Sequence, residues 1–242
     1  MTNRFKRTAL LLGKENMNRL KRAHVLIVGC GAVGGYAIEA LARAGIGQLT
    51  IVDFDDVSES NINRQILALD STVGQKKVRV AQRRIMDINP DCRVQALDMM
   101  VGADTVQQII DLKPDFVIDA IDSLNSKVAL IEVLQKEGIP FISSMGAALR
   151  TNPADIQITS CKKTMNCPLA FFVRKRLRHR DVDLNFPVVY SKELTHVDCF
   201  AKADEPNQKG GRVRNQLGSL PTITGIFGLM CAHYVIMQLS KD

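Results

Sequence analysis

Short apolar runs alternate with stretches that favour helix along the first 150 residues of the chain. Most of the runs are continuous and rich in Val and Ile, which is typical of strands buried on both faces. The predicted strands are 25–28, 49–52, 93–97, 116–121 and 139–143. The predicted helices are 14–22, 33–44, 75–88, 104–112 and 124–136. This alternation predicts a Rossmann-like α/β fold, a mostly parallel sheet with helices on both faces.

Three glycines lie where the predicted strand 25–28 passes into the predicted helix 33–44. Gly29, Gly31 and Gly34 follow the apolar run 25–28. Glycines at this spacing permit a tight turn and a close approach of backbone to phosphate, and the helix N-terminus offers N–H groups to the anion. The second strand ends at Asp53, about twenty residues further on, where a carboxylate can bind ribose hydroxyls. We therefore expect an adenine nucleotide here.

The regular alternation of apolar runs and helix-favouring stretches ends at about residue 150. Residues 156–159 and 188–190 predict short strands, the first of them antiparallel, and residues 217–239 predict a long apolar helix. We expect a single domain over 1–242, with an antiparallel extension of the sheet in its C-terminal half. Its parts are a nucleotide-binding core at 1–150, a variable basic insert at 151–216 and a final apolar helix at 217–242.

Composition bears on three further questions, namely metal binding, cellular location and membrane contact. The chain has 242 residues, a net charge of +7 and six cysteines without a Cys-x-x-Cys pair, so we expect no structural zinc. His196 and Cys199 are spaced like half a metal site whose other half is missing. The N-terminus carries no long apolar segment, which predicts a reduced, cytoplasmic setting. The final helix contains Pro221 and His233 and favours a buried position over membrane contact.

Polar motifs after the glycine turn sharpen the interpretation. Asp53-x-Asp55, Asn61-x-x-Arg64-Gln65, Gly74-Gln-x-Lys77 and Asp119-x-x-Asp122 follow one another along the chain. In this combination the chain resembles the superfamily of adenylating enzymes that activate ubiquitin, molybdopterin synthase and the thiamine sulfur carrier. The resemblance covers about residues 4–150 strongly and the final helix more loosely. It implies an ATP-dependent enzyme that transfers AMP to a carboxylate.

The resemblance also implies roles for individual residues. Asp53 would bind ribose, and Asp122 would hold Mg²⁺ bound to ATP. The phosphates would be contacted by Asn61, Arg64 and Lys77. The nucleotide-binding set is Gly29, Gly31, Gly34, Asp53, Asp55, Ser60, Asn61, Arg64, Lys77, Asp122 and Ser123. The catalytic set is Arg64, Lys77, Asp122 and Arg7. In the family a basic residue from the partner's N-terminal arm completes the site, and Arg7, with Arg4 nearby, matches it, which implies a homodimer.

The nature of the carboxylate is the next question. A short chain, the Arg-Phe-Lys-Arg start and a basic stretch between Phe171-Phe172 and Phe186 resemble the tRNA threonylcarbamoyladenosine dehydratase branch. That branch adenylates the threonyl carboxylate of a modified adenosine in tRNA and then closes a ring with net loss of water. Cations of the stretch would neutralise RNA phosphates. They are Arg174, Lys175, Arg176, Arg178 and Arg180.

Several alternatives stay open at this point. The same site could activate the C-terminus of a ubiquitin-like or sulfur-carrier protein, although the zinc-binding Cys-x-x-Cys pairs of such enzymes are missing. A nicotinamide-dependent oxidoreductase would explain the glycines and Asp53 but not Arg64 or Lys77. A nucleotide-binding adaptor without catalysis is a third alternative. A thiol intermediate, or sulfur transfer with a protein partner, would require a cysteine such as Cys199, Cys161 or Cys167.

Overall fold

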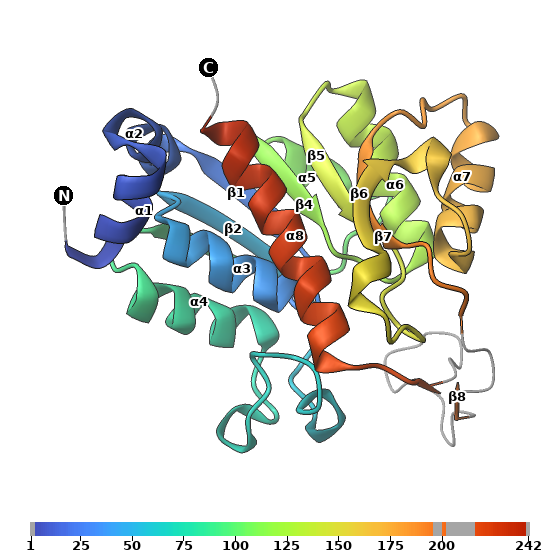
Figure 1. The fold of residues 1–242 in the computed structure, drawn as a ribbon, viewed down its shortest axis with the longest axis horizontal. Coiled ribbons are helices and arrows are strands. Elements are labelled where there is room, and N and C mark those ends of the chain that lie inside the picture. The colour runs from blue at the N-terminus through green and yellow to red at the C-terminus, as the bar shows by residue number, and fades with distance from the viewer. Residues whose placement is uncertain (1–2, 196–199, 202–215, 241–242) are drawn as a thin grey trace.

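A seven-stranded sheet forms the centre of the protein (Figure 1). The computed structural model describes residues 3–195, 200–201 and 216–240. The strand order is β3-β2-β1-β4-β5-β7-β6, and every neighbouring pair is parallel except β7 and β6. The strands are β1 (His24–Val28), β2 (Gln48–Asp53), β3 (Arg93–Asp98), β4 (Phe116–Asp119), β5 (Phe141–Ser144), β6 (Ile156–Ser160) and β7 (Pro187–Ser191). The predicted α/β class and its antiparallel extension are confirmed.

Helices cover both faces of this sheet. In chain order they are α1 (Lys6–Leu12), α2 (Lys14–Arg22), α3 (Gly34–Ala44), α4 (Lys77–Ile88), α5 (Val106–Ile110), α6 (Leu124–Lys136), α7 (Pro168–Arg178) and α8 (Pro221–Leu239). A separate pair of two-residue strands, β8 (Phe200–Ala201) and β9 (Gln216–Leu217), precedes α8. Helices α3, α4 and α8 lie on one face, and α5, α6 and α7 lie on the other (Figure 1).

The core consists of two apolar clusters separated by the sheet. Val25 and Ile27 of β1 belong to the cluster under α3, α4 and α8, whereas Leu26 and Val28 belong to the cluster under α5, α6 and α7. Successive side chains of a strand point to opposite faces, so a continuous apolar run serves both clusters at once. This burial on both sides explains why the strands carry no polar alternation.

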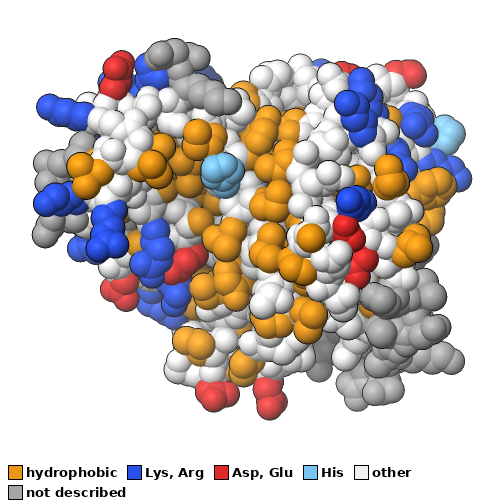
Figure 2. Space-filling model, in the orientation of Figure 1, with side chains coloured by type: hydrophobic (Ala, Val, Ile, Leu, Met, Phe, Trp, Pro, Cys, Tyr) orange, Lys and Arg blue, Asp and Glu red, His pale blue; other side chains and the backbone are white. Residues whose placement is uncertain are grey.

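Helix α8 packs closely on α3. A Cβ atom on Gly228 would lie 2.2 Å from the Val33 carbonyl oxygen, so α8 has no room for a side chain where it meets the start of α3. Within the described residues, α8 is the one helix long and apolar enough to cross a membrane, and 44% of its most apolar window is buried in the protein. Figure 2 shows hydrophobic side chains in a band along this face. The packing agrees with the predicted buried helix.

Element ends differ from expectation in several places, among them α8, which begins at Pro221 instead of residue 217. Strand β4 ends at Asp119 instead of residue 121, because the Asp119 carboxylate accepts a hydrogen bond from Ile121 N (3.1 Å) and turns the chain out of the sheet. Helix α5 covers only Val106–Ile110 of the predicted 104–112. Helices α2 and α6 begin and end where the sequence predicts. The polar stretch 202–215 lies outside the described residues, and the division into core, insert and final helix stays a prediction.

Candidate nucleotide-binding and adenylation site

The candidate site lies where three neighbouring parallel strands end. Strand β1 lies between β2 and β4. The chain leaves β1 toward β2 on one side and later returns to β4 on the other, so the strand order reverses beside β1. Open α/β sheets bind ligands at this kind of switch point, outside the carboxyl ends of the strands. The glycine turn, Asp53 and the loop that holds Asp122 follow these three strands.

The three glycines of the turn have different roles. Gly29 has a φ of +96°, and a Cβ atom there would lie 2.7 Å from the Ala120 carbonyl oxygen. A Cβ atom on Gly34 would lie 1.7 Å from the Gly29 carbonyl oxygen. At Gly31 a Cβ atom would meet nothing closer than Gln65 Nε2, at 3.8 Å. Gly29 and Gly34 therefore allow the turn to close, whereas Gly31 leaves open space in front of α3.

Asp53 connects the glycine turn to the following loop. One carboxylate oxygen accepts a hydrogen bond from Cys30 N (2.6 Å), and the other accepts one from Asp55 N (2.8 Å). Burial raises the pKa of the Asp53 carboxyl above its usual value, and the Lys77 ammonium and the two N–H groups offset this only in part. The backbone thus fixes the carboxylate beside the turn, at the position expected for ribose binding.

Two consecutive lysines have opposite environments. Lys77 begins α4, is buried, and donates from Nζ to Asp55 Oδ2 at 3.0 Å. Lys76 is partly exposed, forms ion pairs with Asp56 (3.1 Å) and Asp98 (3.3 Å), and donates to the Phe54 carbonyl oxygen (3.3 Å). The choice of Lys77 over Lys76 rested on the resemblance alone, and the structure places Lys77 on the same side as Asp55 and Asp53.

The loop between β2 and α4 carries the remaining polar candidates. Arg64 Nη1 donates to the Ser60 carbonyl oxygen (2.9 Å) and to Asn63 Oδ1 (2.8 Å). Asn61 is buried and accepts a hydrogen bond from Ser58 N (3.3 Å). Both residues therefore stabilise the loop's own fold. Ser60 is exposed, with its hydroxyl 3.1 Å from that of Ser58.

Asp122 and Ser123 follow β4, on the other side of the turn. Asp122 is exposed, and Ser123 precedes α6, where its carbonyl oxygen accepts a hydrogen bond from Lys127 N (3.0 Å). Ala120, two residues before Asp122, packs against Gly29 and Gly34. The loop after β4 is therefore in direct contact with the glycine turn.

A buried ion pair supports this loop, and sequence reasoning missed it. Lys127 Nζ lies 2.6 Å from Asp119 Oδ2, and both side chains are fully buried. The ammonium also donates to Ser143 Oγ (3.1 Å) and to the Ser144 carbonyl oxygen (3.0 Å), and Ser143 donates to Asp119 (2.6 Å). A charge on the inward face of α6, between Leu124 and Val128, is the signal that could have predicted a buried partner.

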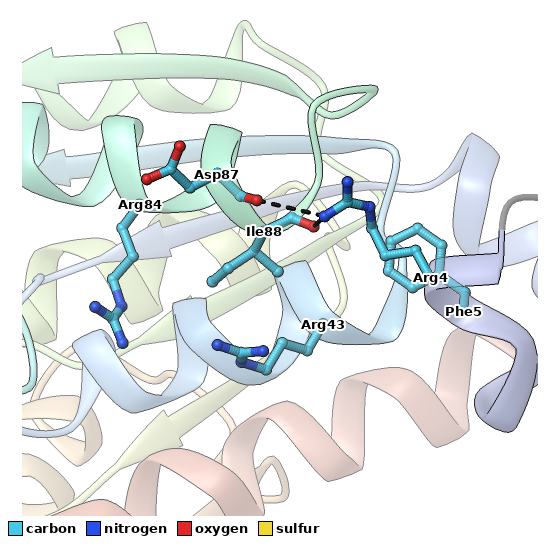
Figure 3. A pocket seen from close by; sticks show the side chains of 6 residues that line it. All are labelled: Arg4, Phe5, Arg43, Arg84, Asp87 and Ile88. Atoms are coloured by element: carbon cyan, nitrogen blue, oxygen red, sulfur yellow. Dashed lines mark hydrogen bonds between the residues drawn. The ribbon is translucent and has the colours of Figure 1, made fainter.

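The N-terminal arm lies at the C-terminal ends of α3 and α4, and the glycine turn lies at the N-terminal end of α3. Arg4 donates to the carbonyl oxygens of Ile88 (2.8 Å) and Asp87 (3.4 Å) at the end of α4, and Phe5 packs on Gly45 after α3. A pocket of about 520 Å³ lies beside these contacts (Figure 3). It is lined by Arg4, Phe5, Arg43, Arg84, Asp87 and Ile88. Arg7 is exposed on α1. Because Arg4 and Phe5 are held at the C-terminal ends of α4 and α3, this arm does not reach the glycine turn of its own chain.

The basic stretch forms α7 and the turn after it. Val173 and Leu177 are buried, while Lys175, Arg176 and Arg178 are exposed. Lys and Arg side chains gather over this helix in Figure 2. Arg174 instead donates to Thr164 Oγ1, and Arg180 pairs with Glu132. Phe171 and Phe172 are about half exposed, with their ring centroids 5.3 Å apart. The helix therefore presents cations and aromatic rings together.

The described thiols are not placed for covalent chemistry. Cys161 and Cys167 are buried, and burial raises the pKa of Cys161 to about 12. A thiol with such a pKa is hardly ionised at neutral pH and is a poor nucleophile. Cys199 and His196 lie outside the described residues. Among the described side chains, no group of three or more His, Cys, Asp or Glu residues could hold a metal ion.

Comparison with known proteins extends this picture. The ThiF family model matches residues 5–242. The chain is 40% identical to the tRNA threonylcarbamoyladenosine dehydratase of Bacillus subtilis, over 100% of this chain and 96% of that protein. It is 36% identical to the Escherichia coli tRNA N6-threonylcarbamoyladenosine dehydratase in complex with AMP, with a TM-score of 0.86 over 98% of this chain and 93% of that chain. The same protein in complex with ATP matches equally well. The chain belongs to the ThiF family and, within it, to the tRNA threonylcarbamoyladenosine dehydratases.

Proposed function

We propose that this enzyme uses ATP to adenylate the threonyl carboxylate of threonylcarbamoyladenosine in tRNA and then cyclises the product with net loss of water. One observation carries the proposal: the glycine turn, Asp53 and the Lys77–Asp55 pair meet at the strand-order reversal beside β1. The solved Escherichia coli relative, which holds AMP or ATP, supports a nucleotide as the ligand of this place.

The chemistry proceeds in two steps. A threonyl carboxylate oxygen attacks the α-phosphorus of ATP, and pyrophosphate leaves. A nitrogen of the same modification then attacks the activated acyl carbon, and AMP leaves with the former carboxylate oxygen. Negative charge gathers on the phosphate oxygens in the first step, so cations fixed in advance stabilise its transition state.

Named residues supply these functions. Gly31 and the first N–H groups of α3 would cradle phosphate, and Asp53 would hold the ribose. Lys77 is buried next to Asp55 and would place its ammonium against the phosphates without a large reorganisation. Arg64 uses Nη1 for its described hydrogen bonds, so Nε and Nη2 would serve phosphate oxygens in the forked geometry of a guanidinium.

Magnesium would enter with ATP. Asp122 is an exposed carboxylate at the end of β4, and its loop touches the glycine turn through Ala120. A single carboxylate combined with substrate phosphates is a usual way for proteins to hold Mg²⁺. We therefore assign Asp122 to the ion, which would draw charge from the phosphates during adenylation.

The tRNA would lie across α7. Its exposed Lys175, Arg176 and Arg178 would contact phosphates, and Phe171 and Phe172 would offer faces for unpaired bases. Arg174 and Arg180 already have partners within the chain and would contribute less. For the sulfur-transfer partner considered above, all five described cysteines are buried, which leaves Cys199 as the remaining candidate thiol.

We further propose a homodimer in which Arg7 acts on the partner's nucleotide. Arg7 is exposed, and the arm that carries it is held at the C-terminal end of α4, away from the glycine turn of the same chain. Leu10 and Leu11 of α1 are 78% and 84% exposed, an unusual exposure for leucines that contact between two copies would remove. The cytoplasmic location remains a prediction.

One assay tests the activity. The protein is incubated with ATP, Mg²⁺ and tRNA that carries threonylcarbamoyladenosine, and both AMP release and the mass of the modified nucleoside are measured. We expect AMP formation that depends on tRNA and a product lighter by one water. The Arg64→Ala and Asp122→Ala variants should stay folded and form no AMP. Adenylation of a carrier protein in place of tRNA would contradict the proposal.

Mixing two inactive variants tests the dimer. Arg7→Ala removes the residue given to the partner, and Asp122→Ala removes the residue of the own site. In a mixed dimer one of the two sites contains neither substitution, so activity should return when the two proteins are combined and allowed to exchange subunits. If the exchanged mixture stays inactive, or if Arg7→Ala alone is fully active, Arg7 does not act in this way.

A further inference from the structure

Gln65 is a buried polar residue beside the glycine turn that neither the motif roles nor the mechanism above uses. Its side chain is 7% exposed, and its Oε1 atom is buried without a hydrogen-bond partner in the described part of the chain. At the other end of the amide, Nε2 is 3.8 Å from the place that a Cβ atom on Gly31 would occupy. The amide therefore borders the open space that Gly31 leaves in front of α3.

The surrounding backbone holds Gln65 in this position. Its N–H donates to the Asn61 carbonyl oxygen (2.9 Å), and its own carbonyl oxygen accepts a hydrogen bond from Ala68 N (2.9 Å). The next two residues, Ile66 and Leu67, pack on Gly35 in the first turn of α3. The segment is thus fixed against the helix N-terminus, and the side chain has little freedom to retreat from Gly31.

A buried amide oxygen without a donor destabilises a folded protein, because the group has lost its water and gained nothing in return. An apolar side chain of the same size would avoid this cost. Rotating the amide by half a turn exchanges its oxygen and nitrogen but leaves one end facing Gly31 and the other end buried. Such a local violation is expected where a polar group serves a ligand instead of the fold.

We propose that Gln65 contacts the bound nucleotide, with Nε2 donating a hydrogen bond to a phosphate oxygen held above Gly31. The inference rests on the proposed nucleotide site and adds a neutral donor to its cations. Phosphate is the ligand group of choice, because it offers only acceptors, as an N–H₂ group requires. We assign the ribose to Asp53, whose carboxylate accepts a hydrogen bond from Cys30 N on the other side of the turn.

Nucleotide binding to the Gln65→Met variant tests the contact. Methionine keeps the length and apolar volume of the side chain but cannot donate. We expect the Kd for ATP with Mg²⁺, measured by calorimetry without tRNA, to rise about five- to tenfold, as for the loss of one hydrogen bond. The melting temperature should stay equal or increase, because the unpaired oxygen is gone. Adenosine, which lacks phosphate, should bind both proteins equally.

Matched variants separate this role from a structural one. Gln107→Met changes an exposed glutamine of α5 and should leave the ATP affinity unchanged. Gln65→Asn draws the amide back by one methylene and should weaken ATP binding if the methionine variant does not fold. An unchanged Kd for ATP in Gln65→Met, or an equal loss for ATP and adenosine, overturns the contact. Failure of the wild-type protein to bind ATP would overturn the nucleotide site itself.

Discussion

Lys77 and Asp55 form an ion pair of 3.0 Å in which the lysine side chain is 6% exposed and the carboxylate is 46% exposed. The pair is therefore asymmetric: the cation is held inside the protein, and the anion faces solvent. A buried ammonium needs a partner, and a solvated carboxylate is one that a phosphate can replace with little cost. This relationship is the reason that we propose Lys77 as a preorganised phosphate ligand.

Replacing Lys77 should strongly slow adenylation, while replacing its neighbour Lys76 should not. Lys77→Met removes the cation that we propose stabilises charge developing in the transition state, and we expect AMP formation to fall roughly 10²–10³-fold. Lys76→Met removes partly exposed ion pairs with Asp56 and Asp98 and a hydrogen bond to the Phe54 carbonyl oxygen, and should keep activity within about twofold. Rates of tRNA-dependent AMP release give the answer. Equal losses in both variants would refute the assignment of Lys77.

Two glycines of the same turn should respond differently to alanine. In Gly34→Ala the new Cβ atom would lie 1.7 Å from the Gly29 carbonyl oxygen, so the turn must open and the protein should lose several kcal/mol of stability or fail to fold. In Gly31→Ala the nearest atom is 3.8 Å away, so the melting temperature should hardly change. The methyl group would nevertheless enter the phosphate space. A folded Gly31→Ala protein with normal ATP affinity would contradict the phosphate cradle.

Salt dependence tests the tRNA surface on α7. Each phosphate contact releases counterions, so log K for tRNA should fall linearly with log salt concentration. Lys175→Ala and Arg176→Ala should each weaken binding and reduce that slope by about 1. Lys14→Ala changes an exposed lysine of α2, on the distant N-terminal arm, and serves as the control. If the slope of log K against log salt concentration is the same in the α7 variants as in the wild type, tRNA does not bind on α7.

Glu39 should make stability depend on acid pH. Burial raises the pKa of this carboxyl, but hydrogen bonds from Arg84 (2.5 Å) and Arg43 (2.7 Å) outweigh burial, so the pKa is lower than usual. The unfolded chain then takes up the proton first as pH falls. The stabilisation is complete above the unfolded pKa of about 4.3 and is lost as pH falls through the lower folded value.

The Glu39→Gln variant checks this sign. Its unfolding free energy at pH 7 should be roughly 1–2 kcal/mol lower than that of the wild type, as for lost charged hydrogen bonds. The difference should shrink in thermal unfolding below pH 4. Glu137→Gln, an exposed site after α6, should behave like the wild type throughout. A difference that grows toward low pH would show that the pKa of Glu39 is raised instead.

The sequence predicted the local part of this structure well. Continuous apolar runs and glycines at the first strand end are short-range signals, so the order of elements and the glycine turn could be read directly. The sequence also predicted an antiparallel strand at 156–159, but not that this strand would pair with β7. The register of Lys76 and Lys77 could not be derived from helix periodicity, and only the resemblance indicated which lysine points inward.

Polar contacts between residues far apart in the chain could not be predicted from the sequence pattern. Asp119 and Ser143 lie 24 residues apart and meet Lys127 only because β4 and β5 pair under α6. Gln65 belongs to one of the polar motifs that follow the glycine turn, yet its proximity to Gly31 depends on how a loop folds back onto α3. Sequence pattern fixes which face a residue takes within its element, but not which distant residue it will meet.

A structure with bound nucleotide tests the central claim most directly. Crystals of this protein are soaked with Mg²⁺ and a non-hydrolysable ATP analogue. The α-phosphate should lie over Gly31, with the Lys77 ammonium and the Arg64 guanidinium in contact with phosphate oxygens, and with the ion between Asp122 and the phosphates. A nucleotide seen elsewhere, or with Arg64 and Lys77 directed away from its phosphates, would contradict the account.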